Sequence, residues 1–356
     1  MKKWNHMNIF LRNEAIMRRN RRSKVKRKER NIQRNKHNPY KVRTPKQSFN
    51  RQRQQEITID AGRNFALFTH PDEVIDLIHE LDKYKTKPAF LKRIFIDLSN
   101  IKSIDIGAIN VLLAKINEIS KLKRLHISGN MPIHSECHNL FEESGFLEYM
   151  VDLSGKKFAK KSDSFILSIG SDKTLNEKIG RSIEKSMGYL TGEEKSYPPV
   201  YSIVQEMCSN SIEWANQSDS KSKNWLLGIQ FDKKDDEPIV NFALTDIGFG
   251  IIKTINRKLG TKFKESIGNI SDLEILIRTF DKIYGSKSKE PNRNNGMPLI
   301  KKRFEKGYIS ELRVVTNKVF YDFSNNEQSK VLNRNFPGTY YSWSINSKCI
   351  EKWDQK

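Results

Sequence analysis

The sequence predicts a protein of mixed α/β (α+β) class, with two folded domains behind a basic N-terminal tail. Past residue 55, short β-branched and aromatic runs typical of buried strands alternate with apolar residues at helical spacing. The chain of 356 residues is long enough for two domains with separate cores. Its charge is uneven, because residues 1–55 hold 19 Lys and Arg and two acids, or +17 of the total +22. We therefore expect a tail over 1–55, a first domain over 56–153 and a second over 160–348.

The tail is expected to be disordered. Nine of the thirteen residues in Arg18–Arg30 are basic, and no apolar stripe accompanies them to anchor a helix. Such an arm attracts nucleic-acid phosphates or an anionic membrane surface. The alternative is a solubilising tail with no dedicated partner.

The first domain has the element order of a small α/β layer domain. The helix expected near residues 109–119 is amphipathic, with Ile109, Leu112, Ile116 and Ile119 on one side. The expected elements are a helix over Asp72–Lys83, a strand over Arg93–Ser99, a helix over Ile109–Ile119, a strand over Arg124–Ser128 and a helix over Asn139–Ser144.

The second domain begins with a strand and two helices and ends in strands. Between them, residues 251–295 form a long segment rich in polar side chains. The expected strands are 164–170, Trp225–Phe231, Ile239–Thr245, Ile309–Thr316, Val319–Phe323 and Tyr340–Ile345, and the expected helices are Leu175–Met187, Val200–Ala215 and one that begins near Met297.

Composition excludes several classes of protein. No run approaches the ~20 consecutive apolar residues of a membrane-spanning helix. No apolar stretch follows the N-terminal charges, which argues against secretion. The three cysteines are Cys137, Cys208 and Cys349, an odd number at wide spacing that fits a reducing compartment. We expect a cytoplasmic protein without a transmembrane segment.

The most informative stretch lies on the helix expected over Val200–Ala215. Glu206 and Asn210 are four residues apart and therefore share one side of that helix. A carboxylate and a carboxamide one turn apart can hold a divalent cation and a polarised water. Taken alone the pair is weak evidence for a site, because such pairs are common on solvated helices.

Two glycine-containing motifs follow in order. Asp246 ends an expected strand and is followed by Gly248 and Gly250, so its carboxylate can accept a hydrogen bond from an exocyclic amine while bare backbone lets a planar ring approach. Gly296 begins a helix, and free N–H groups at a helix N-terminus suit phosphate oxygens. Thr339, just before the last expected strand, places a hydroxyl that can reach toward the same ring.

In this order the motifs resemble those of the Bergerat-fold (GHKL) ATPases, the superfamily of histidine kinases, gyrase, chaperones and mismatch-repair proteins. The resemblance covers roughly Asp163 to Asn346, and the helical motif is most similar to that of anti-sigma-factor serine kinases. It implies an α/β sandwich that binds ATP and Mg²⁺.

The resemblance also implies a role for each residue. Asn210 would be the Mg²⁺ ligand, and Glu206 would orient or deprotonate the attacking hydroxyl or water. Asp246 would read the adenine amine, with Gly248 and Gly250 giving close approach. The remaining cofactor-binding residues would be Gly296 at the phosphate helix, Thr339 near adenine, and Lys287, Lys289 and Arg293 in a mobile lid.

Two positions depart from the family pattern. Trp214 stands where the family often has His, and Pro298 stands where the lid motif usually has a second Gly. Proline is tolerated in the first turn of a helix, so nucleotide binding is compatible with Pro298. Closure of the lid and turnover of ATP are less compatible with Pro298.

Residues 56–152 resemble a second family. The stretch Ile94–Ile109 is similar to the STAS domain of anti-sigma-factor antagonists, in which a strand ending in Asp-Leu-Ser leads to a turn that opens a helix. The turn here is Asp105 to Ala108, with Gly107 in place of the serine that is phosphorylated in that family. The resemblance implies a module that docks a protein partner without a phosphorylation switch.

The expected function is therefore a regulatory one, in which ATP and Mg²⁺ order a lid over about 251–295 and so gate a docking surface for a protein partner. One alternative is an active serine/threonine kinase with Glu206 as its base. Another is a non-catalytic adaptor whose basic tail binds nucleic acid. Weak ATPase activity and association with a second copy of the chain stay open.

Overall fold

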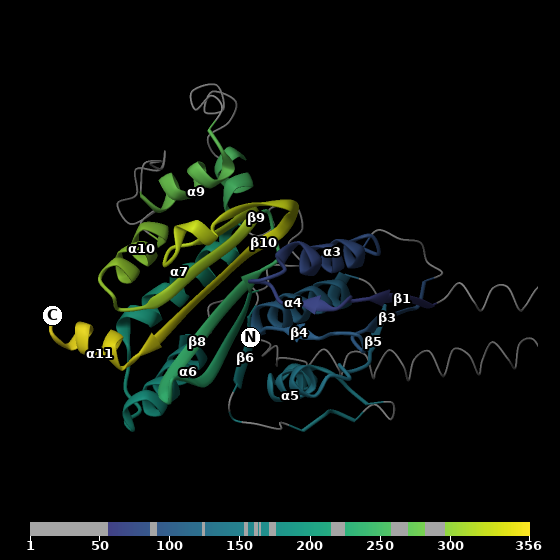
Figure 1. Ribbon diagram of the computed structural model, residues 1–356, viewed down its shortest axis with the longest axis horizontal. Helices are drawn as coiled ribbons and strands as arrows, with labels where there is room; N and C mark the ends of the chain where they lie inside the picture. Colours follow the sequence, from purple (N-terminus) through teal and green to yellow (C-terminus); the bar gives the residue numbers. More distant parts are fainter. Residues whose placement is uncertain are drawn as a thin grey trace, which may run out of the picture. The chain divides into compact units, whose positions relative to one another are not determined.

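The computed structural model has the mixed α/β class that the sequence predicts (Figure 1). The expected tail lies outside the described residues, which are 56–85, 91–122, 125–152, 156–159, 163, 165–170, 176–214, 225–257, 270–281 and 296–356. Two compact units are present, one of Glu56–Phe146 with Lys160–Lys356 and one of Met1–Gln55 with Leu147–Ala159. None of the described helices combines the length and the apolar character that crossing a bilayer requires.

The smaller unit is described only in part. Its described residues begin in a 3₁₀ turn, η2 (Phe146–Tyr149), and include an antiparallel bridge between Val151 and Lys157. The backbone N–H of Lys156 donates to the Asp152 carboxylate at 2.9 Å, next to this bridge.

A parallel sheet opens the larger unit. Its strands are β1 (Glu56–Asp60), β3 (Arg93–Asp97) and β5 (His126–Gly129), in the order β1-β3-β5. Parallel neighbours need crossover connections, and α3 (Pro71–Asp82) and α4 (Ile106–Leu122) lie on these connections. A second parallel pair joins β2 (Asn64–Phe65) to β4 (Ser103–Ile104), and α5 (Ser135–Glu143) follows β5.

Helix α3 shows how local sequence sets an element. Pro71 occupies its first turn, where a missing N–H costs nothing, and Asp72 and Glu73 place negative charge near the helix N-terminus. Val74 and Ile78 are fully buried one turn apart. The expected helix over Asp72–Lys83 is thus confirmed.

An antiparallel sheet of five strands, in the order β6-β7-β8-β10-β9, forms the centre of the second half. The strands are β6 (Phe165–Gly170), β7 (Trp225–Lys234), β8 (Glu237–Asp246), β9 (Ser310–Asp322) and β10 (Lys330–Asn346). The helices are α6 (Asn176–Thr191), α7 (Pro198–Trp214), α9 (Asp272–Phe280), α10 (Gly296–Glu305) and α11 (Ser347–Asp354).

Three features of this half differ from the expectation. One continuous strand, β9, replaces the two expected ones, because pairing with β10 continues on both sides of Asn317 even though that residue is in a left-handed conformation (φ 50°). Strand β10 begins before Gly338, which lies at a register shift inside it. The segment over 251–295 is not wholly irregular, since residues 251–257 are helical and α9 lies within it.

The two faces of this sheet have different partners. Alternate residues of β7, β8 and β10 pack against α6 and α7 in one apolar core, where Phe242 and Trp343 stack with ring centroids 5.3 Å apart. The intervening residues face α4, which contacts β7, β8 and β10. Figure 1 shows α4 and α6 labelled beside these strands.

Helix α4 is buried around its whole circumference from Gly107 to Ile119. Such a helix belongs to the interior of a protein rather than to its surface. One side carries Ile109, Leu112, Ile116 and Ile119, as the sequence predicts. The same helix also buries polar and charged side chains, which the amphipathic pattern does not predict.

The charged side chains of α4 are balanced by α3 and the turn after it. Lys115 is fully buried and pairs with Asp82 and with Glu118, the latter at 2.9 Å, while Lys85 contacts the same two carboxylates at 2.7 and 2.8 Å. Burial lowers the pKa of Lys115 against the pull of the carboxylates. Burial opposes ionisation of Asp82, but pairing with Lys115 and Lys85 outweighs it and lowers the pKa of that carboxyl.

Replacing Lys115 by Met should destabilise the protein strongly. Met keeps the volume of the side chain but leaves Asp82 and Glu118 without their buried partner, and breaking such a pair costs about 3–5 kcal/mol. Urea denaturation followed by circular dichroism measures this loss. The exposed pair Arg181–Glu177 on α6 serves as control, because Arg181→Ala should cost less than about 1 kcal/mol. Equal costs for the two variants would contradict a structural role for the buried cluster.

Candidate functional site

Helix α7 carries the carboxylate–carboxamide pair. Glu206 and Asn210 are both half-buried, and the side-chain amide of Asn210 donates to Glu206 Oε1 at 3.3 Å. Ile203 and Met207, which flank the pair around the helix, are buried in the core between α7 and the sheet. Packing therefore fixes the helix so that the pair lies at the margin of the core, partly accessible to solvent.

Gly296, the first residue of α10, lies directly against this pair. A Cβ atom at position 296 would overlap the Glu206 carboxylate, so any other residue there would force the end of the Glu206 side chain to move. The positive end of the α10 dipole favours a carboxylate at this place. Pro298 falls in the first turn of α10, where proline fits, and does not prevent the helix from forming. The Glu206 side chain thus reaches the helix N-terminus at which the sequence predicts a phosphate.

Asp246 is buried at the end of β8, with 7% of its surface exposed. It is paired in register with Trp225 on β7 and Thr339 on β10. Burial raises the pKa of the Asp246 carboxyl to about 7, although hydrogen bonds from Thr339 and from the Ser211 hydroxyl favour the charged form. A carboxyl group poised between its two protonation states is unusual, and such groups concentrate at functional sites.

The loop after Asp246 packs closely against β9 and β10 at two glycines. Gly250 has a φ of 78°, in the left-handed region, and a Cβ atom there would lie 2.6 Å from Asn317 Oδ1. Gly338 on β10 would similarly place a Cβ atom 2.9 Å from the backbone N of Gly248. The loop is therefore packed against β9 and β10 at positions where side chains do not fit.

Two side chains from β9 hold this loop and the helical segment 251–257. The Asn317 Oδ1 atom accepts from the N–H groups of Ile252 and Lys253 at 3.0 and 3.3 Å, while its Nδ2 donates to the carbonyl of Phe249 at 2.8 Å. Thr316 Oγ1 accepts from the N–H of Ile251 at 2.9 Å. These bonds satisfy the first N–H groups of the helical segment from a distant strand, as an N-cap does locally.

Most of the expected site residues converge. Ser211 is next to Asn210 and connects α7 to Asp246. Burial, reinforced by the charges of Asp246 and Glu206, raises the pKa of Tyr341, which places both carboxylates near its ring. The residues brought together around α7, the end of β8 and the start of α10 are Glu206, Asn210, Asp246, Gly248, Gly250, Gly296 and Thr339. Lys287, Lys289 and Arg293 lie outside the described residues.

Sequence reasoning missed Ser211, Thr316, Asn317 and Tyr341. Their roles depend on contacts between elements far apart in the chain, and the only local signal is that Ser211 adjoins Asn210. Among the described residues, no group of three or more His, Cys, Asp or Glu side chains is placed to bind a metal ion.

No family model matches the chain, and no curated protein is similar to it in sequence. The function is therefore inferred from the arrangement of the chain's own residues. That arrangement is a half-buried carboxylate–carboxamide pair beside a helix N-terminus, with a buried carboxyl group close by.

The raised pKa of Asp246 predicts a pH dependence of stability. Between the ordinary pKa of 3.8 and the folded value of about 7, the folded protein holds a proton that the unfolded chain has lost. Raising the pH through this window therefore lowers the free energy of unfolding, by about 4 kcal/mol at most. Asp246→Asn removes the ionisation and should be more stable than the wild type at pH 8, with little advantage at pH 4. Urea titrations at both pH values test this, and an equal advantage at both would contradict it.

Gly296→Ala should destabilise the protein and disturb the pair on α7. The added methyl group overlaps the Glu206 carboxylate, and overpacking of this kind costs about 1–3 kcal/mol. The matched control is Gly180→Ala on α6, where a Cβ atom meets nothing within 4 Å and the helix gains propensity. Thermal unfolding of the two variants should show a lower midpoint for Gly296→Ala only. Similar midpoints would mean that the Glu206 carboxylate moves aside at no cost and that its contact with the start of α10 does not stabilise the protein.

Proposed function

We propose that the chain is a regulatory ATP-binding protein of the Bergerat (GHKL) type, whose nucleotide site lies between α7, the end of β8 and the start of α10. The observation that carries this proposal is the convergence of Glu206, Asn210, Asp246 and Gly296. These four residues are separated by up to 90 positions in sequence, yet α7 and its neighbours bring them together.

Asp246 fits the role of adenine reader. Its carboxylate is buried beside the Thr339 and Ser211 hydroxyls, a setting in which an exocyclic amine can donate a hydrogen bond. Gly250 is packed against Asn317 and Gly338, so of the two glycines it is the half-buried Gly248 that would offer bare backbone to a planar ring. The donor bond from the base would favour the ionised carboxyl, so nucleotide binding and ionisation of Asp246 would support each other.

Glu206 and Asn210 fit the phosphate side of the site. The Asn210 carboxamide would hold Mg²⁺ through its oxygen, and Glu206 would orient a water or hydroxyl group. Bound Mg²⁺ would neutralise phosphate charge. In the structure Asn210 donates to Glu206, so its amide oxygen is directed away from that bond and is suited to a cation. Gly296 lets the Glu206 carboxylate lie against the N-terminus of α10, and a bound phosphate would replace that carboxylate there.

The parallel sheet with α3 and α4 would be a STAS-like module in the same chain. Asp105 opens α4 and accepts from the N–H groups of Ala108 and Phe68 at 2.7 and 3.0 Å, so the turn is well ordered. At Gly107, a Cβ atom would lie 2.9 Å from the Tyr340 hydroxyl. A phosphorylated side chain does not fit at this position, which supports a module without the family's phosphorylation switch.

ATP binding tests the proposal directly. Isothermal titration of the full chain with ATP should show binding that depends on Mg²⁺. Asp246→Asn removes a charge-assisted hydrogen bond and should weaken binding about 10- to 100-fold, and Asn210→Ala should abolish the Mg²⁺ dependence. The matched control is Asp232→Asn, an exposed position on β7, which should bind ATP like the wild type.

The same experiment separates the alternatives. Unchanged binding in Asp246→Asn would overturn the adenine assignment, and unchanged Mg²⁺ dependence in Asn210→Ala would overturn the metal assignment. Transfer of labelled phosphate to a protein, lost in Glu206→Gln, would favour a serine/threonine kinase. Absence of ATP binding to the wild type would overturn the proposal and favour a non-catalytic adaptor.

A further inference from the structure

The two faces of strands β8 and β10 contact different parts of the protein. Asp246 and Thr339 are paired in register and lie on the face toward α7, in the proposed nucleotide site. The next pair, Thr245 and Tyr340, points to the opposite face, where α4 lies. One step along the same two strands therefore separates the nucleotide site from the contact with α4.

The contact between α4 and the sheet is close at two points. At Gly107, a Cβ atom would lie 2.9 Å from the Tyr340 hydroxyl, and at Gly228 on β7, a Cβ atom would overlap the carboxamide of Asn110. Both glycines are needed because helix and sheet approach without space for a side chain. The close packing of α4 on the sheet holds β10 at Tyr340, the residue that follows Thr339.

The side of α4 that faces the sheet is small and polar. Gly107, Asn110, Ala114 and Asn117 follow helical spacing on this side. Within the described part of the chain, neither polar atom of the Asn110 carboxamide has a hydrogen-bond partner, and the Thr245 hydroxyl opposite also lacks one. Buried polar groups are nearly always bonded, so these atoms make the contact less stable than an apolar one of equal area.

The edge of the same contact is polar and exposed. Asp72 on α3 accepts from the backbone and side-chain N–H groups of Asn333 at 3.0 Å and from the N–H of Arg334 at 3.2 Å. Asp76 pairs with Arg334 at 2.9 Å. Water can replace each of these bonds if the two surfaces part.

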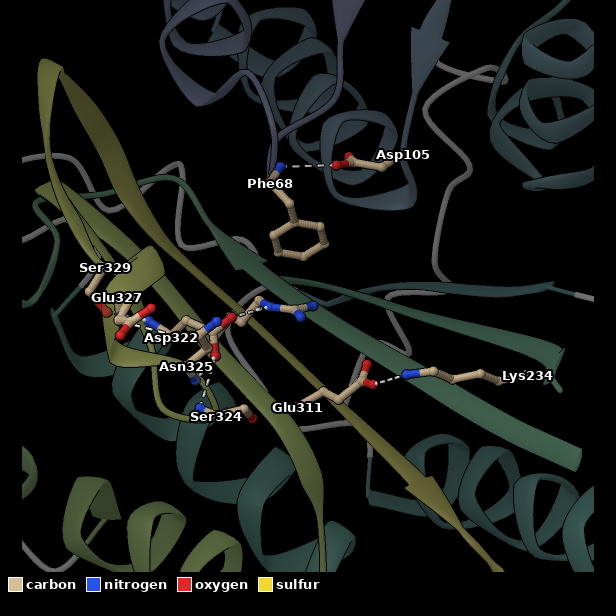
Figure 2. A network of polar contacts seen from close by, with 10 residues as sticks. Phe68, Asp105, Lys234, Glu311, Asp322, Ser324, Asn325, Glu327 and Ser329 are labelled. Atoms are coloured by element: carbon tan, nitrogen blue, oxygen red, sulfur yellow. Dashed lines mark hydrogen bonds and ion pairs between the residues drawn. The ribbon is translucent and has the colours of Figure 1, made fainter.

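Phe68 is the apolar anchor of the contact. Its ring packs edge-on against Phe320 and Tyr340, with centroids 6.4 and 5.8 Å away, and the Arg313 guanidinium lies 5.0 Å from the ring centre. Its backbone N–H donates to Asp105, as Figure 2 shows. Arg313 is held in turn by Asp322 at 2.7 Å. A single half-buried ring therefore joins the start of α4 to β9 and β10.

We propose that residues 56–122 are an internal regulatory partner of the nucleotide site, and that nucleotide binding stabilises their contact with the sheet. The proposal rests on the proposed ATP site. Its direction follows from the geometry, because pairing of β10 with β8 holds Thr339 opposite Asp246, and the α4 contact packs against Tyr340, the next residue of β10. When the surfaces part, β10 stays paired with β8 and β9 but loses the packing on Tyr340, which loosens Thr339 and weakens the nucleotide site. Since coupling is reciprocal, ATP favours the closed contact by the same factor.

Hydrogen exchange and ATP affinity together test the coupling. ATP with Mg²⁺ should slow amide exchange in α4 and in Tyr340–Ser344, although α4 contributes nothing to the nucleotide site. Asp72→Ala removes the exposed bonds to Asn333 and Arg334 together with a charge at the N-terminus of α3, and should weaken ATP binding about five-fold. Asp72→Asn also lacks the charge but keeps an acceptor oxygen, and should largely restore binding because the bonds carry the effect. Asn110→Leu removes the unbonded carboxamide and should strengthen ATP binding and slow exchange in α4 without nucleotide. Glu177→Ala on α6 is the control and should change neither quantity.

The outcomes separate this proposal from the one on which it rests. If the wild type does not bind ATP, both are overturned. If ATP binds but exchange in α4 is unchanged and Asp72→Ala binds ATP like the wild type, the internal partner is overturned and the nucleotide site stands. Should Asn110→Leu destabilise the protein, the Asp72 variants decide the matter, because their bonds lie outside the core.

Discussion

The register between β8 and β10 is the constraint on which the rest of the structure depends. It places Asp246 opposite Thr339 on one face and Thr245 opposite Tyr340 on the other. If β10 shifted by one residue against β8, its side chains would turn to the opposite face, so that Tyr340 would meet α7 in place of Thr339. The bulge at Gly338 and the left-handed Asn317 fix this register from within β10 and from the neighbouring β9. The loop that contains Gly250 then packs against Asn317 on β9.

Much of the fold was predictable from the sequence because its elements follow simple periods. The apolar spacing in α3, α4 and α7 and the β-branched runs in β3 and β8 identify their own elements. Boundaries inside β9 and β10 were not predictable in the same way. A polar Asn-Lys pair and a Pro-Gly pair resemble strand ends in sequence, but pairing with neighbouring strands carries the chain through both.

The residues of the candidate site also differ in whether the sequence predicts them. Asp246, the two glycines after it and the Glu206–Asn210 pair stand out by residue type and spacing. Ser211 and Asn317 do not, because a serine hydroxyl or an asparagine amide acquires a role only from the backbone that folding brings to it. Helix α4 shows this limit most clearly. Its apolar side was evident, whereas the polar side becomes meaningful only against a sheet more than 100 residues later in the chain.

The burial of Asp246 also has a consequence for the heat of any binding reaction at this carboxyl. Because its pKa is near 7, about half of the molecules in a neutral solution carry a proton there. A ligand that donates a hydrogen bond to the carboxylate selects the other half, so each binding event releases about half a proton to the buffer. The measured enthalpy would then vary with the ionisation enthalpy of the buffer. The number of protons released per bound ligand therefore measures how far binding ionises the Asp246 carboxyl.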